Sequence, residues 1–334
     1  MIFMSLKAIL LDALNATALK RVFLTLCLKL FLFPALLLGQ DHAWWANNVN
    51  WDESTHWSSY ITFSPGMMGS NALPIPEPLG VAKRPLGLSM GTVFAYNPED
   101  VSDALYFNLA LSPFSDRFQI SFYGMPFEFF KTSHRIKTER KTFWRTYENN
   151  VANGDLQLNT YFRILEETFQ RPQLDLRIHY RFPTSDNVGA ARFTDTPGYF
   201  FDVGIEKTLI NKRLKDKYLK KYFVNLGFYA WQTNVDRQFQ NDAVVFGAGV
   251  KWDQSTAGWS IYTNGFIGYQ NNGDQPVLVG VGRHFNGVII KAEQGIHDYP
   301  FFRIKLEKTV LGSRFFNTFR ENRFKVKVVD GPTT

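Results

Sequence analysis

The sequence of 334 residues contains a single cysteine, Cys27, which excludes an intrachain disulfide framework, a cysteine-rich zinc site and an iron–sulfur cluster. Its six histidines are scattered and none has the spacing of a metal-binding motif, so we expect neither a metal site nor another cofactor. The mean hydropathy of −0.19 is too low for a bundle of membrane-spanning helices. What the chain does have is 16% aromatic and 45% hydrophobic residues, which argues against disorder and favours an all-β fold.

Residues 1–39 predict a cleaved export signal. The segment is basic and then carries an apolar run from Leu30 to Leu38, followed by the small residue Gly39. A membrane anchor is the alternative, but Lys29 interrupts the run and the remainder is too short for a bilayer, which needs ~20 apolar residues. Cleavage would leave a mature chain without cysteine, which suits export to an oxidising compartment.

From about residue 85 onward, apolar residues alternate with polar ones at a period of two. Successive strand residues point to opposite faces, so each segment has one apolar face and one polar or small face. Twelve such segments lie near 85–96, 103–111, 116–125, 154–166, 172–182, 197–208, 220–232, 242–252, 257–269, 275–284, 286–294 and 300–309. Many exceed the ~5–6 residues of a usual soluble strand and match the ~9–11 of a tilted strand that crosses a bilayer. The sequence therefore predicts an all-β fold, an antiparallel up-and-down transmembrane β-barrel of about twelve strands over residues 85–310.

The connections between these segments alternate in length, as they do in barrels with short periplasmic turns and longer outer loops. Short connections are expected at 112–115, 167–171, 253–256 and the Phe285-Asn286-Gly287 corner. Longer ones are expected at 126–153, 183–196 and 233–241, while 209–219 is a longer connection on the short side.

The export signal, the cysteine-free body, the twelve amphipathic strands and the aromatic strand ends together resemble a Gram-negative outer-membrane β-barrel. The resemblance covers about residues 85–310 and concerns architecture, so no functional residue is carried over from it. It implies a location in the bacterial outer membrane, in contact with lipid and lipopolysaccharide. A soluble, secreted β-sandwich or lipocalin-like barrel would show the same alternation. Strand length, strand number and glycines on the non-apolar face favour the membrane.

Two flanking segments are assigned to the periplasm. Residues 40–84 contain four closely spaced prolines, which favour an extended backbone, and are expected to form a strap or a plug. Residues 311–334 form a C-terminal tail, and both segments are candidate docking surfaces for other envelope proteins. His56 and Ser58 are spaced like a hydrolase pair, but no orienting group or oxyanion donor can be assigned to them, so we expect no enzyme. No nucleic-acid partner is expected because no binding module is visible.

Candidate functional residues lie on the polar faces of the strands, which the barrel would turn inward. Facing rows of both charge signs create a transverse field, which favours small polar or zwitterionic solutes. We therefore expect a small passive channel, with a non-conducting structural or accessory subunit of an envelope complex as the alternative. The inward set is Asp175, Arg177, His179, Arg181, Asp202, Glu206, Lys251, Lys291, Glu293, Arg303, Lys305 and Glu307.

Charged stretches in two outer connections are also informative. The basic run 131–145 is expected to meet lipopolysaccharide phosphates. Glu99, Asp100 and Asp103 form an acidic cluster that we expect to be a solvated loop.

Overall fold

The computed structural model describes residues 42–60, 69–72, 75–82, 86–142, 149–185, 190, 192–193, 197–209, 219–235, 238–253, 257–268, 275–297 and 300–312. The predicted signal 1–39 and nearly all of the predicted tail 311–334 lie outside these residues. The strands are β1 (Gly87–Asn97), β2 (Asp100–Leu111), β3 (Phe118–Thr132), β4 (Asn149–Ala152), β5 (Leu156–Leu165), β6 (Gln173–Phe182), β7 (Gly198–Leu209), β8 (Leu219–Val235), β9 (Gln238–Asp253), β10 (Ala257–Ile267), β11 (Val277–Phe285), β12 (Val288–His297) and β13 (Phe302–Gly312).

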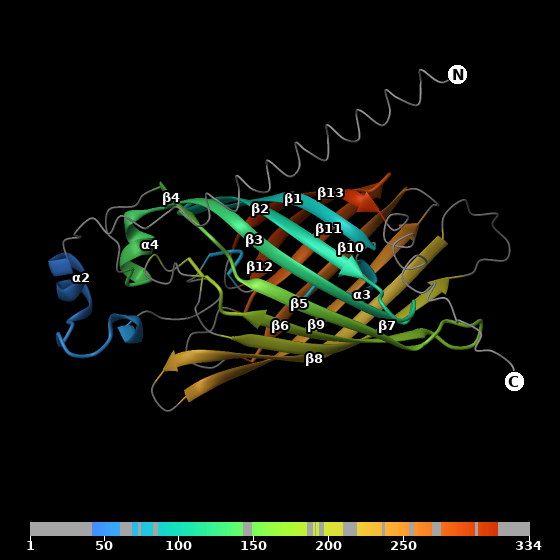
Figure 1. Ribbon diagram of the computed structural model, residues 1–334, viewed down its shortest axis with the longest axis horizontal. Coiled ribbons are helices and arrows are strands. Elements are labelled where there is room, and N and C mark those ends of the chain that lie inside the picture. Colours follow the sequence, from blue (N-terminus) through green and yellow to red (C-terminus); the bar gives the residue numbers. More distant parts are fainter. Residues whose placement is uncertain are drawn as a thin grey trace, which may run out of the picture. The chain divides into compact units, whose positions relative to one another are not determined.

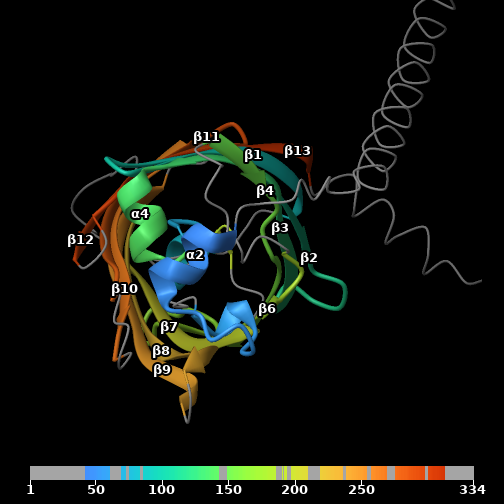
Figure 2. The ribbon, with the colours of Figure 1, turned by 90° about the vertical axis from the view of Figure 1, so that its left-hand side faces the viewer.

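These strands form one closed antiparallel ring. Neighbours in sequence pair with each other, and β1 pairs with both β2 and β13, which closes the sheet on itself (Figure 2). β4 and β5 share one position in the ring, because β5 pairs with residues 118–123 of β3 and β4 pairs with residues 128–131. The wall therefore has twelve positions, and the predicted twelve-stranded antiparallel barrel is confirmed.

The two faces of the wall have opposite character. Along β7, Phe200 and Asp202 are buried, whereas Phe201 and Val203 are exposed. Around the ring, charged side chains are buried inside and large apolar side chains such as Leu226 (62% exposed) cover the outside. A soluble barrel packs its apolar side chains inward, so an apolar outer wall around a charged interior requires lipid surroundings. The chain is a transmembrane β-barrel, and the alternative of a soluble sandwich or lipocalin-like barrel is wrong.

The strands extend further at one end than their hydrophobic pattern indicated. The predicted connection 126–153 is wrong in extent, because β3 continues to Thr132 and is followed by α4 (His134–Glu139) and β4. The predicted loop 233–241 is also wrong, because β8 and β9 continue as a hairpin through most of it. In 233–241 only Val235 and Phe239 are apolar, so the alternation in hydrophobicity stops while the backbone pairing continues. The predicted connection 209–219 lies almost entirely outside the described residues.

The predicted tight corner between β11 and β12 is a two-residue turn. Asn286 and Gly287 have φ angles of 46° and 76°. A two-residue hairpin turn of this kind requires positive φ at both positions, and Asn-Gly is the sequence that tolerates it best. The turn lies at the end of the barrel where β1 begins and β13 ends.

Residues before β1 form a small cap at the other end of the barrel. The cap comprises α2 (His42–Val49) and the 3-10 helix η1 (Trp57–Tyr60) together with the residues between them. Trp45 is fully buried, its ring lies against Trp51 and Tyr60, and its indole Nε1 donates to the carbonyl of Lys141, 3.0 Å away. Lys141 follows α4, so the cap and α4 share one mouth (Figure 1). No helix among the described residues is long and apolar enough to cross a membrane.

From the cap, the chain reaches β1 through the interior of the barrel. We call the described residues 69–72 and 75–82 the plug segment; its last four residues form α3 (Leu79–Ala82). Small residues in the wall leave room for it: a side chain at Gly204 would collide with Leu79, and one at Gly247 would collide with Pro78. The described residues of the predicted segment 40–84 thus run from the cap into the interior of the barrel. Its assignment to the periplasm stays a prediction.

Cysteine labelling should place the cap and the short turns on opposite sides of the membrane. Asn47 is exposed in the cap, and Asp116 is exposed in the turn between β2 and β3 at the other end. We expect Asn47→Cys to react with an impermeant maleimide on intact cells, and Asp116→Cys only after permeabilisation, because short turns face the periplasm. Labelling of both from one side would contradict the threaded plug segment; reversed labelling would contradict the orientation alone.

Candidate functional site: the barrel lumen

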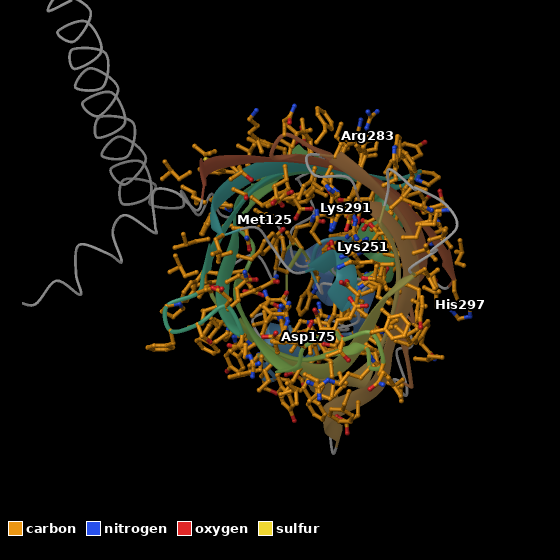
Figure 3. All side chains as sticks on the ribbon, turned by 90° about the vertical axis from the view of Figure 1, so that its right-hand side faces the viewer. Met125, Asp175, Lys251, Arg283, Lys291 and His297 are labelled. Carbon is orange, nitrogen blue, oxygen red and sulfur yellow. The ribbon has the colours of Figure 1, made fainter. Side chains whose placement is uncertain are left out.

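All twelve residues of the predicted inward set project from the inner face of the wall. Nine are buried, while Asp175, Lys251 and Lys305 are half-buried. Figure 3 shows Asp175, Lys251 and Lys291 inside the ring, whereas Arg283 and His297 lie on its outside. Whether this set lines a conducting path stays a prediction.

On β6 and β7, the predicted residues form a cross-strand ion pair. Arg177 and Asp202 are register partners, and the guanidinium Nε and Nη2 donate to the two carboxylate oxygens at 2.7 and 2.6 Å. Asn225 of β8 donates to the same carboxylate at 2.5 Å. A buried charge is tolerated when it is paired and its hydrogen-bonding positions are occupied, and the bidentate pair with its additional donor meets both conditions.

Other wall charges are also paired within the wall. Glu293 and Arg303 are register partners on β12 and β13, 2.6 Å apart. Glu206 lies 2.9 Å from Lys221 and 2.8 Å from Lys251, on neighbouring strands. Cross-strand neighbours of opposite charge stabilise a sheet, and these pairs do so without any group from outside the wall.

Lys291 depends instead on the plug segment, and Lys305 does so in part, because its other carboxylate neighbour is Glu293 of the wall, 3.8 Å away. Lys291 and Lys305 are register partners, so two like charges lie directly opposite each other, which destabilises a sheet. Glu77 of the plug segment bridges them, with its carboxylate oxygens 2.5 Å from Lys291 Nζ and 3.3 Å from Lys305 Nζ. Glu77 is not among the predicted residues, because a proline-rich stretch has no periodicity from which its neighbours can be inferred.

The wall also holds the backbone of the plug segment. Pro76 and Pro78 have no N–H, so this stretch cannot pair as a strand, and its carbonyls need other donors. Wall side chains supply them: Arg303 donates to Ser70 (3.5 Å), Arg181 to Ala72 (3.3 Å), Asn264 to Pro76 (3.0 Å) and Lys251 to Gly80 (3.0 Å).

A second buried network ties the outer connections together at the mouth that carries the cap. Arg192 donates to Asp100 (2.6 Å) and to Glu128 (2.7 Å), and Arg140 also pairs with Asp100. Asn71 of the plug segment donates to Glu128 at 2.9 Å. Arg140 and Arg192 lie in connections between strands, where no alternation indicates which way a side chain points, so they were missed.

The predicted solvated acidic cluster is therefore wrong for Asp100, which is buried between arginines. Glu99 lies in the turn between β1 and β2 and is also paired, through a hydrogen bond from Arg135 Nε at 2.8 Å. That hydrogen bond holds the pKa of Glu99 below its ordinary value. In the predicted basic run 131–145, Lys137 and Arg140 are buried rather than available to phosphates.

Two further sequence candidates have specific environments. His179 is hydrogen-bonded through Nδ1 to Asn159 Oδ1 at 2.8 Å and stacks on Phe200, with ring centroids 4.3 Å apart. Its hydrogen-bond partner is thus an amide. Glu307 accepts a hydrogen bond from the Tyr106 hydroxyl at 3.1 Å. His56 is exposed in the cap, and the side chain of Ser58 lies outside the described atoms.

Comparisons with known proteins add little to this geometry. No family model matches the chain, and no curated protein matches it. Among solved structures, the KdgM porin covers 66% of this chain and 98% of its own, at 8% identity and a TM-score of 0.37. The translocator domain of the autotransporter NalP from Neisseria meningitidis covers 69% and 90%, at 9% identity and a TM-score of 0.37. The β-domain of the Bordetella autotransporter BrkA covers 68% and 100%, at 10% identity and a TM-score of 0.37. At these TM-scores, none of them indicates what this chain does.

Proposed function

We propose that this protein is a channel of the bacterial outer membrane for small polar solutes, held closed by the plug segment and opened when that segment shifts. The observation that carries the proposal is the way in which charge is divided between wall and plug segment. The pairs Arg177–Asp202 and Glu293–Arg303 lie within the wall, whereas Glu77 is the plug residue that pairs with Lys291 and Lys305.

This division allows the plug segment to shift while the wall stays folded. Besides the pairs of Glu77 and the hydrogen bond from Asn71 to Glu128, the polar contacts described above are hydrogen bonds to backbone carbonyls, which water in an open lumen can replace. Twelve wall positions also enclose more space than the side-chain-filled eight-stranded barrels, and less than the 16–18-stranded porins with their aqueous channels.

Reversing the charge of Glu77 should open the channel. In Glu77→Lys, a third ammonium group would face Lys291 and Lys305, so the plug segment would be repelled from the wall. Removing one partner of a buried pair costs about 3–5 kcal/mol, and ~3 kcal/mol corresponds to about a hundredfold increase in the open fraction. In planar bilayers, we expect rare openings of the wild type and frequent, anion-preferring openings of the variant.

The matched control for this experiment is Glu53→Lys, which makes the same charge change on an exposed residue of the cap. It should conduct like the wild type. Assembly of each variant is checked by fractionation with the outer membrane and by anomalous gel migration without boiling. If Glu77→Lys assembles and remains as silent as the wild type, the proposed channel is wrong.

The second candidate function is a non-conducting structural or accessory subunit of an envelope complex. The cap favours it, because a folded element held by Trp45 at one mouth offers a surface to a partner. Silent barrels in both the wild type and Glu77→Lys, together with co-purification of a defined envelope protein that is lost when residues of the cap are changed, would support this function.

A further inference from the structure

Between the plug segment and one side of the wall there is a cavity of about 100 Å³. Because a void of about 10–15 Å³ already holds one water molecule, the cavity has room for several waters or for a small organic molecule. Its lining combines strands β2, β3, β5, β6, β7 and β13 with residues of the plug segment. The polar side chains of the lining that carry no charge include Asn71, Asn108, Ser121, Gln157 and Asn159.

Three polar atoms in this lining have no hydrogen-bond partner among the described residues. They are Asn108 Nδ2, Ser121 Oγ and His179 Nε2, and each of the three side chains is at most 2% exposed. A buried polar group without a partner costs about 1–3 kcal/mol, so such groups are rare in folded proteins and call for an explanation. Here three of them, from three different strands, line one cavity, which points to an occupant that supplies the missing hydrogen bonds.

The hydrogen-bonding roles of these atoms restrict the occupant. Asn108 Nδ2 is a donor, and the Ser121 hydroxyl can donate or accept. His179 donates from Nδ1 to the Asn159 oxygen, so in the neutral ring Nε2 is an acceptor. An occupant that both donates and accepts hydrogen bonds at several points satisfies all three groups. Hydroxyl groups suit this role, because each hydroxyl oxygen can donate and accept.

The charges of the lining point to a neutral occupant. Arg177 is paired with Asp202, Arg303 with Glu293 and Lys305 with Glu77, so the charges next to the cavity already have partners. The rings of Tyr123, Tyr161 and Phe200 and the side chains of Ile75 and Met125 complete the lining and offer apolar surface to carbon-bound hydrogens. Most of the lining is polar, which suits an occupant with many hydrogen-bonding groups and a small apolar surface.

We propose that this cavity binds a small neutral polyhydroxylated compound, such as a short polyol, between the wall and the plug segment. The proposal rests on the proposed function, because it names the class of solute that the channel would admit. The hydroxyls bond to Asn108, Ser121 and His179, and the carbon chain packs on the aromatic rings. Since Ser70, Asn71 and Glu77 also line the cavity, the bound solute contacts the element that closes the lumen.

Calorimetric titration of the folded, detergent-solubilised protein with erythritol tests the proposal. We expect saturable binding of erythritol, weaker binding of a four-carbon diol that lacks the two inner hydroxyls, and no binding of threonate, which carries a charge. Because entry into a closed barrel is slow, a second sample is folded in the presence of each compound, dialysed, and analysed for retained ligand.

Two variants and one matched control separate a binding role from a structural one. Ser121→Ala and Asn108→Ala each remove one unpartnered group, and we expect roughly five- to tenfold weaker erythritol binding with no loss of thermal stability. Ser89→Ala is the control, because Ser89 Oγ is equally buried and unpartnered among the described residues but does not line the cavity. Its affinity for erythritol should equal that of the wild type.

The outcomes distinguish this proposal from that of the channel. If erythritol binding depends on Ser121 but the Glu77→Lys variant does not conduct, the result would support the binding site and overturn the channel. A conducting Glu77→Lys variant, with no erythritol bound or retained by the wild type, would overturn the site and leave water as the occupant. Equal binding of erythritol and the diol would likewise overturn it, because the hydroxyls would then contribute nothing.

Discussion

Replacing Arg177 by methionine should destabilise the barrel by about 3–5 kcal/mol, the cost of leaving a buried charge without its partner. Arg177 is 2% exposed and Asp202 is fully buried, and two hydrogen bonds join them. In Arg177→Met, the Asp202 carboxylate would keep only the amide donor of Asn225. We expect a lower midpoint of urea unfolding in detergent micelles and a smaller fraction of assembled protein.

Two further variants show whether the uncompensated charge is the cause. Arg283→Met makes the same substitution on the outside of β11, where the guanidinium lies over the Trp259 ring, and should change stability by about 0.5 kcal/mol or less. Combining Arg177→Met with Asp202→Asn removes the charge and should restore most of the lost stability. Equal effects of Arg177→Met and Arg283→Met would show that the inner ion pair contributes nothing.

Replacing Leu226 by arginine should cost about 2–4 kcal/mol if the residue lies at the depth of the membrane midplane. Leu226 is near the middle of β8, is 62% exposed, and has Val203 and Phe246 as its register partners on the two neighbouring strands. An arginine there must either extend to the interface or remain in hydrocarbon. The expected result is impaired assembly in cells and a lower unfolding midpoint in lipid vesicles.

The same change outside the lipid-facing band should be tolerated. Phe169 lies in the turn between β5 and β6 and is 71% exposed, so Phe169→Arg introduces the same charge where water is available. Leu226→Ala removes apolar surface without adding charge and should cost less than Leu226→Arg. If Leu226→Arg and Phe169→Arg are tolerated equally, the outer face of β8 is not in contact with lipid.

The fold could be predicted from the sequence because the membrane imposes a rule on each strand separately. Along β7, alternation alone indicates that Asp202 and Val203 point to opposite faces, and it does so without knowledge of any neighbour. The same reasoning fails wherever both faces are polar. That is why the end of the β8–β9 hairpin near its connection was taken for a loop. The end of β3 was missed for another reason, because Pro126 and the adjacent Phe129 and Phe130 interrupt its alternation.

The partners within the lumen could not be predicted, because they depend on register and on elements without a period. That Lys291 lies opposite Lys305 follows from the pairing of β12 with β13, which the sequence does not specify to the residue. That Glu77 bridges both requires knowing that a proline-containing segment passes through the barrel. Arg140 and Arg192 lie in connections between strands, where the sequence does not indicate which way a side chain points.

The threaded path of the chain limits how wide the passage can become. The plug segment continues into β1 at one mouth, and it is joined covalently to the cap, which Trp45 fixes at the other. As long as the cap stays in place, the plug segment remains inside the lumen, because the chain is held at both ends of the barrel. The widest opening is then the space beside a displaced plug segment. A fully empty lumen would first require the cap to detach and pass through the barrel.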